Sequence, residues 1–101
     1  METRSTSFGE MTHLLKLDGK VSAEYLVFKK SGRKHRHPDY ESFFVMAGTG
    51  KIFSGENVHE VKPGSLVTIP PMTDHWMEPD EGSEMTGLLW YHEDVLTPHE
   101  Y

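Results

Sequence analysis

A chain of 101 residues with a net charge of −6 has the length of one domain and lacks the basic excess that favours nucleic acid as a partner. It contains no cysteine, so any bound metal must be held by imidazole and carboxylate groups. No window approaches the ~20 apolar residues of a membrane helix. The first residues, METRSTSFGEMTHLL, lack the apolar core of a secretory signal. We therefore expect one domain over residues 1–101, a cytoplasmic location and no membrane partner.

Short runs rich in β-branched and aromatic residues recur along the chain, and no segment carries an apolar stripe at helical spacing. Asp18-Gly19 accepts the positive φ values of a tight turn and predicts a first hairpin, and Gly55-Glu56-Asn57 predicts a second. Strands are expected over residues 13–17, 21–29, 42–47, 51–54, 58–61, 65–69, 75–78 and 85–92. Short strands with frequent Gly and Pro between them favour an all-β sandwich or barrel.

Potential metal ligands cluster between His35 and Glu41. Alternate side chains of an extended segment share a face, so His35 and His37 are expected to point to one side. Glu41 has the same parity as Phe43 and Val45, which places its carboxylate in the interior that these apolar side chains fill. A buried carboxylate is costly unless it is protonated, paired or bound to a cation.

A further candidate ligand, His75, follows the rigid turn at Pro70-Pro71. Spacing alone does not prove that it meets the first cluster, and a histidine pair by itself is more often a surface or hydrogen-bonded pair than a pair of ligands. The remaining histidines are interpreted as surface or hydrogen-bonded residues: His13, His59, His92 and His99. A short basic cluster over residues 29–36 is interpreted as a solvated rim, with contact to an anionic ligand as the alternative.

The stretch from His35 to Gly48 has the pattern HxHxxxExxxxxxG, which resembles the first conserved motif of the cupin family. The stretch from Gly64 to Pro70, with His75 five residues beyond it, resembles the second motif. Both lie in the expected order, as in small single-domain cupins of the cupin 2 type, and the resemblance covers about residues 21–92. It implies an all-β fold, a jelly-roll β-barrel forming a single cupin domain.

Three positions depart from the family pattern. Lys29 stands where the first motif opens with glycine, and Met72 and Pro79 stand where the second usually has glycine and asparagine. None of them is a candidate ligand. These departures therefore concern turn geometry and pocket shape.

The resemblance implies one divalent transition metal, Fe, Mn, Ni, Co or Zn, held by His35, His37, Glu41 and His75. An octahedral ion in such a set keeps two positions free, whereas a tetrahedral ion is nearly closed. Cupins often dimerise by pairing edge strands, so a homodimer is expected. The pocket lining is expected from these strand residues, which are otherwise ordinary barrel core: Phe43, Val45, Met77, Leu88, Trp90, Tyr25 and Tyr91.

The function that follows from the resemblance is that of a metal-dependent enzyme of dioxygenase, isomerase or lyase type, acting on a small oxygen-bearing molecule. Glu41 is expected to be a ligand and is a candidate base. The alternative is a non-catalytic cupin that binds or senses a small molecule, with the metal in a structural role. A cupin that has lost its metal is the third interpretation, and the filled ligand positions disfavour it.

Overall fold

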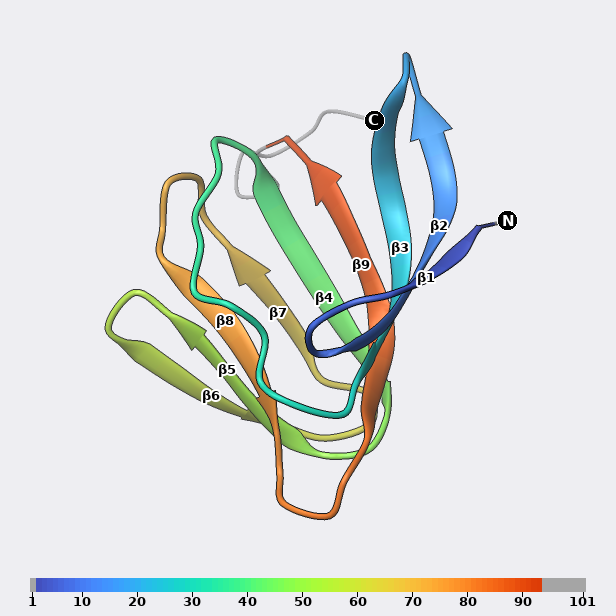
Figure 1. Cartoon of the computed structure of the whole chain (residues 1–101). Helices are drawn as coiled ribbons and strands as arrows, with labels where there is room; N and C mark the ends of the chain where they lie inside the picture. Colours follow the sequence, from blue (N-terminus) through green and yellow to red (C-terminus); the bar gives the residue numbers. More distant parts are fainter. Residues whose placement is uncertain (1, 94–101) are drawn as a thin grey trace.

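The computed structural model describes residues 2–93, and these form antiparallel strands without any helix (Figure 1). Within that range no helix is long and apolar enough to cross a membrane. The strands are β1 (Thr3–Ser5), β2 (Gly9–Leu17), β3 (Lys20–Phe28), β4 (Tyr40–Ala47), β5 (Gly50–Ser54), β6 (Asn57–Val61), β7 (Leu66–Ile69), β8 (His75–Pro79) and β9 (Met85–His92). The all-β prediction is thus confirmed, while His99 and the rest of the tail lie outside the described residues.

The strands form a six-stranded sheet with the order β1-β2-β3-β9-β4-β7 and a three-stranded sheet with the order β6-β5-β8. In the larger sheet β9 pairs with both β3 and β4, although it follows them by many residues. This crossed order is typical of a jelly roll. It brings the C-terminal strand into the centre of the larger sheet, beside the strand that carries Glu41.

The first predicted hairpin is confirmed, because Asp18 and Gly19 have φ values of 51° and 78° and join β2 to β3. The expected strand at 13–17 is longer than predicted and begins at Gly9. Strand β1 was not predicted from the sequence. It pairs with β2 at the edge of the larger sheet, where tertiary pairing stabilises a polar segment that has no strand pattern of its own.

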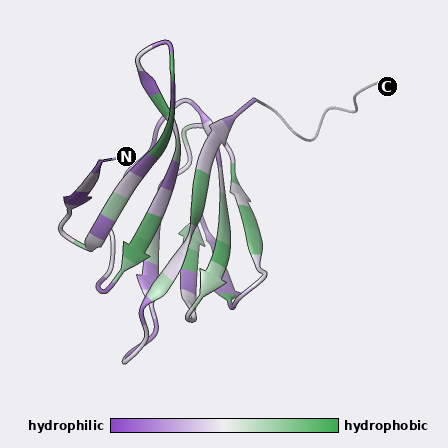
Figure 2. Ribbon diagram, turned by 90° about the vertical axis from the view of Figure 1, so that its right-hand side faces the viewer, coloured by the Kyte–Doolittle hydropathy of each residue, from purple (hydrophilic) through white to green (hydrophobic). Residues whose placement is uncertain are grey.

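The core lies between the two sheets and takes alternate residues from strands such as β3, β4 and β7. Figure 2 shows hydrophobic and hydrophilic stretches alternating along the strands, as expected for sheets with one face buried. The buried apolar residues are Leu26, Phe28, Phe43, Val45, Ile52, Val61, Val67, Ile69, Met77, Met85 and Leu89. Glu41 is 1% exposed on the same strand and with the same parity as Phe43 and Val45, so its predicted inward orientation is confirmed.

Candidate metal centre

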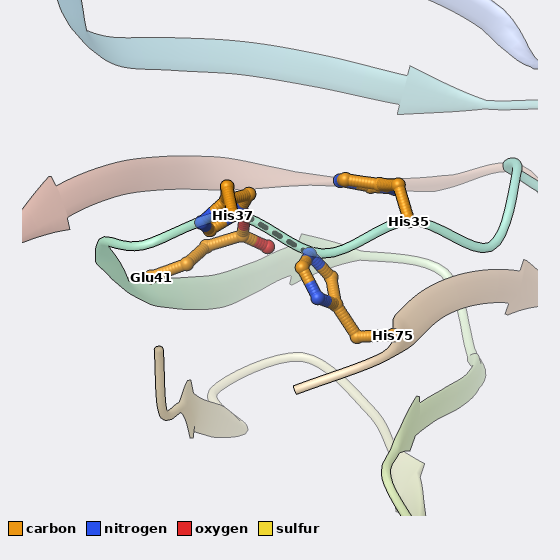
Figure 3. A group of neighbouring side chains, drawn as sticks. All are labelled: His35, His37, Glu41 and His75. Atoms are coloured by element: carbon orange, nitrogen blue, oxygen red, sulfur yellow. Dashed lines mark hydrogen bonds and ion pairs between the residues drawn. The ribbon is translucent and has the colours of Figure 1, made fainter. Parts of the chain in front are cut away.

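Three segments bring four polar side chains together at one end of the space between the sheets (Figure 3). His35 and His37 lie on the segment 29–39 that links β3 to β4, Glu41 lies near the start of β4, and His75 is the first residue of β8. One ligand atom of each residue can be chosen so that all lie within 4.8 Å of one another. The group could therefore hold a metal ion.

Backbone hydrogen bonds fix the histidine segment against β8 and the turn before it. The amide of His35 donates to the carbonyl of His75 at 3.1 Å, and the amide of His75 donates back to the carbonyl of His35 at 2.9 Å. The amide of Met72 donates to the carbonyl of His37 at 2.7 Å. Both histidines of the segment are thus positioned by the chain that carries His75.

The backbone conformation at Met72 shows how the chain accommodates one departure from the family pattern. Its φ is +55°, in the left-handed region that favours glycine, and its side chain is 56% exposed. The chain therefore keeps the turn conformation for which glycine is usual at this position, with a residue that is strained there. The hydrogen bond from Met72 to His37 holds the strained turn in place.

The three candidate ligand histidines, His35, His37 and His75, each direct the same ring nitrogen, Nδ1, to a backbone carbonyl. Their Nδ1 atoms lie at hydrogen-bond distance from a carbonyl two residues away: His35 and Arg33 at 2.8 Å, His37 and Asp39 at 3.1 Å, His75 and Thr73 at 2.8 Å. A carbonyl oxygen only accepts, so each Nδ1 carries a proton. The neutral form of each ring then has its lone pair on Nε2, the arrangement found in histidines that bind metals.

The Nε2 atoms of two of these rings face the Glu41 carboxylate. The Nε2 of His37 lies 2.9 Å from Oε1 of Glu41, and the Nε2 of His75 lies 3.3 Å from the same oxygen. The Nε2 of His75 is buried and has no hydrogen-bond partner of good geometry. Lone pairs and a carboxylate at these distances repel unless a proton or a cation lies among them. Imidazole nitrogens with one carboxylate suit a divalent transition metal, so the residues fit such an ion.

Burial and mutual attraction oppose each other in this cluster. Burial alone would raise the pKa of Glu41, but the nearby imidazoles of His75 and His37 lower that pKa below its usual range. Burial would also lower the pKa of His75, yet the nearby Glu41 carboxylate, the hydrogen bond to the Thr73 carbonyl and the charge of Asp74 raise it above its usual range. Without a cation the cluster therefore favours a proton on His75 beside an ionised Glu41.

This pairing predicts that metal binding releases a proton from His75, because the ligand nitrogen must be free. Affinity is expected to rise by about tenfold per pH unit below the raised pKa of His75 and to level off above it. Calorimetric titration with Ni²⁺ in buffers of different ionisation enthalpy measures the released proton. An affinity that does not change over this pH range would contradict the pairing.

In the metal-free protein, the contribution of His75 to stability changes with pH in the opposite direction from the metal affinity. The raised pKa of His75 contributes stability that is present below its unfolded value and is lost as the pH rises through the folded pKa. The lowered pKa of Glu41 contributes stability that is lost as the pH falls through its folded value. Urea denaturation of the metal-free protein over this pH range should therefore find the cluster stabilising between these two pKa values.

A cavity of about 480 Å³ opens beside the cluster and includes His35, Glu41 and His75 in its wall. Its volume lies in the range of small-molecule sites. The apolar part of the wall comes from both sheets and from the chain before β2: Phe8, Met11, Leu26, Phe28, Met77 and Leu89. The cavity thus places a largely apolar surface directly beside the candidate metal ligands.

Only some of the residues proposed as pocket lining lie in the wall of this cavity. Met77 and Tyr91 line it. Phe43 and Val45 point inward but are fully buried in the core and do not form part of the cavity wall. Packing between the two sheets covers them completely.

Tyr25, Leu88 and Trp90 do not line the cavity, because they have the wrong parity. Tyr25 pairs with Leu88 across β3 and β9, whereas Glu24 pairs with Leu89, and the Glu24–Leu89 pair is the one on the buried face. The sequence analysis chose the correct strands, β3 and β9, but did not decide which of the two alternating sets of side chains on each strand points into the cavity. Both sets of β9 are apolar, so hydropathy gave no basis for the choice.

Glu24 is a cavity residue that the sequence analysis missed. It is 6% exposed and alternates with the buried residues Leu26 and Phe28. The other alternating set of β3, Val21, Ala23, Tyr25 and Val27, is apolar as well, so parity alone does not place Glu24 inside. Its position was decided by strand pairing and not by a signal in the sequence.

The fold agrees with comparisons to known proteins. A family model described as "Cupin domain" matches residues 23–91. A search of curated protein sequences finds no match. Among solved structures, a protein of Photorhabdus luminescens superposes with a TM-score of 0.76 at 18% identity, covering 94% of this chain and 82% of that one.

Two proteins of Thermotoga maritima are similar to the same extent. A cupin-like protein has a TM-score of 0.75 at 22% identity and covers 97% of this chain and 85% of that one. A predicted oxalate decarboxylase has a TM-score of 0.74 at 17% identity and covers 93% and 100% of the two chains. At these identities the likeness concerns the fold, and the family model covers most of the chain. This protein belongs to the cupin family.

Proposed function

We propose that this cupin is a metal-dependent enzyme that acts on a small oxygen-bearing molecule, with a dioxygenase or an isomerase reaction favoured and a lyase reaction as the further option. The main support for this proposal is the position of candidate ligands in the wall of a largely apolar cavity of about 480 Å³. A metal used only to stabilise the fold needs no such cavity. A metal that binds a substrate does.

The residues that would hold the ion are His35, His37, Glu41 and His75. A bound divalent ion supplies Lewis acidity to a substrate oxygen and, in the case of iron, the capacity to activate dioxygen. The backbone carbonyls keep the imidazoles in the tautomer that such an ion requires. Glu41 is held between two histidines, so we assign it the role of ligand first and of base second.

The remaining wall of the cavity excludes water and orients the substrate. Phe8, Phe28 and Met77 present apolar surface, and the exposed Arg33 and Lys34 border the cavity on the side of the histidine segment. Tyr91 packs its ring edge-on against His37, with 5.3 Å between the ring centroids. Burial raises the pKa of Tyr91, so its phenol stays protonated and can donate a hydrogen bond to a substrate oxygen.

The second candidate function is a binding or sensing cupin in which the metal is structural. The observation that favours it is that His35 and His37 lie outside the regular strands, on a segment joined to β8 through an isolated bridge. A metal shared with His75 and Glu41 would fasten that segment to both sheets. In this case metal loading stabilises the protein and no reaction occurs.

Turnover by the metal-loaded protein separates the two functions. The protein loaded with Fe²⁺, Mn²⁺, Ni²⁺ or Co²⁺ is incubated with enediols, keto acids and phenols, and oxygen uptake and product masses are recorded. Product formation that requires the metal supports the enzyme. Metal-dependent stabilisation without product across the panel supports the structural role.

We infer that the partner of this chain is a second copy of itself. Residues Leu66, Phe44, Leu88 and Tyr25 form a continuous cross-strand row on the outer face of the larger sheet, and Leu66 is 57% exposed on the edge strand β7. Exposed apolar surface next to an unpaired edge favours association. Light scattering is expected to give twice the chain mass of 11.6 kDa, and a monomer would contradict the inference.

A further inference from the structure

Glu24 is a second buried carboxyl in the wall of the cavity, and the candidate metal ligands do not include it. Its side chain comes from β3, and its Oε2 atom is buried without a hydrogen-bond partner. None of the ion pairs among residues 2–93 includes it. A buried polar atom without a partner costs stability, and such groups concentrate at functional sites.

The groups around Glu24 come from four strands: Arg4 on β1, His13 on β2, Tyr91 on β9 and Glu41 on β4. Burial raises the pKa of Glu24, and the charge of Glu41 adds to this effect. Interactions with His13, Arg4 and Tyr91 oppose it without cancelling it. Burial thus opposes ionisation of Glu24, and its buried Oε2 atom can accept a hydrogen bond from a bound molecule.

The position of Glu24 relative to the metal centre follows from the strand register. Glu24 pairs with Leu89, and Glu41 pairs with Tyr91, so the two carboxyls lie on one face with β9 between them. Neighbouring strands are ~4.8 Å apart, which separates β3 from β4 by about 10 Å. Tyr91 lies between the two acids on that face and lines the cavity. A single ring or a short chain fills such a distance.

We propose that Glu24 binds a second polar group of the substrate, a hydroxyl, across β9 from the metal centre. The proposal rests on the proposed function, in which the metal centre binds the first oxygen. The substrate class is therefore a small, largely apolar molecule with a polar group at each end. The apolar wall that includes Met11, Leu26 and Leu89 contacts the apolar part of such a molecule.

The test uses benzohydroxamate, which chelates transition metals, together with its 3-hydroxy and 4-hydroxy derivatives. Each is titrated calorimetrically into the Ni²⁺-loaded full-length protein. At least one hydroxylated probe is expected to bind about tenfold more tightly than the plain one, the gain from one buried hydrogen bond. In Glu24→Leu this gain is lost while the plain probe keeps its affinity, and in Glu24→Gln part of the gain returns. Equal affinities of the three probes for the wild type, or a gain that persists in Glu24→Leu, would overturn the proposal.

A second measurement makes the result independent of the metal. Phenol is titrated into the metal-free protein while the carboxyl ¹³C signals of glutamate are followed by NMR. We expect phenol to shift one glutamate carboxyl signal, which is assigned to Glu24 because it is absent from Glu24→Leu. The absence of a shift in that signal would count against the proposal. If plain benzohydroxamate fails to bind the loaded protein, the open metal site is wrong, and the phenol titration alone then decides the role of Glu24. Glu60→Leu, which replaces an exposed glutamate on β6, is the matched control and should leave every affinity unchanged.

Discussion

Replacement of His75 by alanine is expected to leave the purified protein with less than about a tenth of the metal found in the wild type. His75 is 1% exposed and its Nε2 lies 3.3 Å from Oε1 of Glu41, so its replacement removes one of the four candidate ligands from the buried side of the cluster. Elemental analysis of protein from the same culture medium measures the effect. We expect about one ion per chain in the wild type.

The loss of metal should also remove its stabilisation. A ligand at a thousand times its dissociation constant stabilises the folded state by about 4 kcal/mol, and addition of metal should raise the melting temperature of the wild type but not that of His75→Ala. His59→Ala is the matched control, because His59 is an exposed histidine on β6. His37→Ala, at a less buried position, tests the same site where His75→Ala fails to fold. A full metal content in both ligand variants would overturn the assignment.

Replacement of Gly48 by alanine is expected to destabilise the metal-free protein by about 3 kcal/mol or more. Gly48 has a φ of +78°, which costs ~1–2 kcal/mol for any residue with a Cβ atom. An added Cβ would also lie 2.0 Å from the carbonyl oxygen of Glu84 and 2.9 Å from the Cα of Met85. Both are backbone atoms, so the chain after β4 and the chain before β9 must move apart. Overpacking of this kind costs ~1–3 kcal/mol more.

Gly64→Ala separates the two causes. Gly64 also has a positive φ, +93°, but an added Cβ meets no atom within 4 Å. Its replacement should therefore cost only the conformational strain, about 1–2 kcal/mol. Urea denaturation of both variants without metal gives the two free energies of unfolding. Equal losses in the two variants would show that the contact with Glu84 does not matter.

Much of the candidate centre could be predicted because its causes are local. His35 and His37 lie two residues apart, and Glu41 shares the parity of Phe43 and Val45, so their common orientation depends only on an extended backbone. The Asp18-Gly19 turn is local in the same sense, since it depends on the φ values that these residues tolerate. The meeting with His75 depended on the resemblance to the family, because no local rule joins residues so far apart in the chain.

The inward faces of β3 and β9 could not be decided from hydropathy. Each face of β9 carries large apolar side chains, Leu88 and Trp90 on one and Leu89 and Tyr91 on the other. The choice is made by register with β4, where Glu41 pairs with Tyr91 and Phe43 with Leu89. Register is a property of the paired strands, so it was not available from either strand alone.

The sequence by itself determined an all-β chain, its turns, and the ligand types of a candidate metal centre without cysteine, because these follow from backbone preference and side-chain chemistry over a few residues. Only the tertiary structure decided which carbonyls orient the imidazoles, which strand faces line the cavity, and that Glu24 stands across β9 from Glu41. These features arise where segments distant in sequence are brought together by strand pairing. The cavity and its second acid are therefore products of the order of strands in the larger sheet.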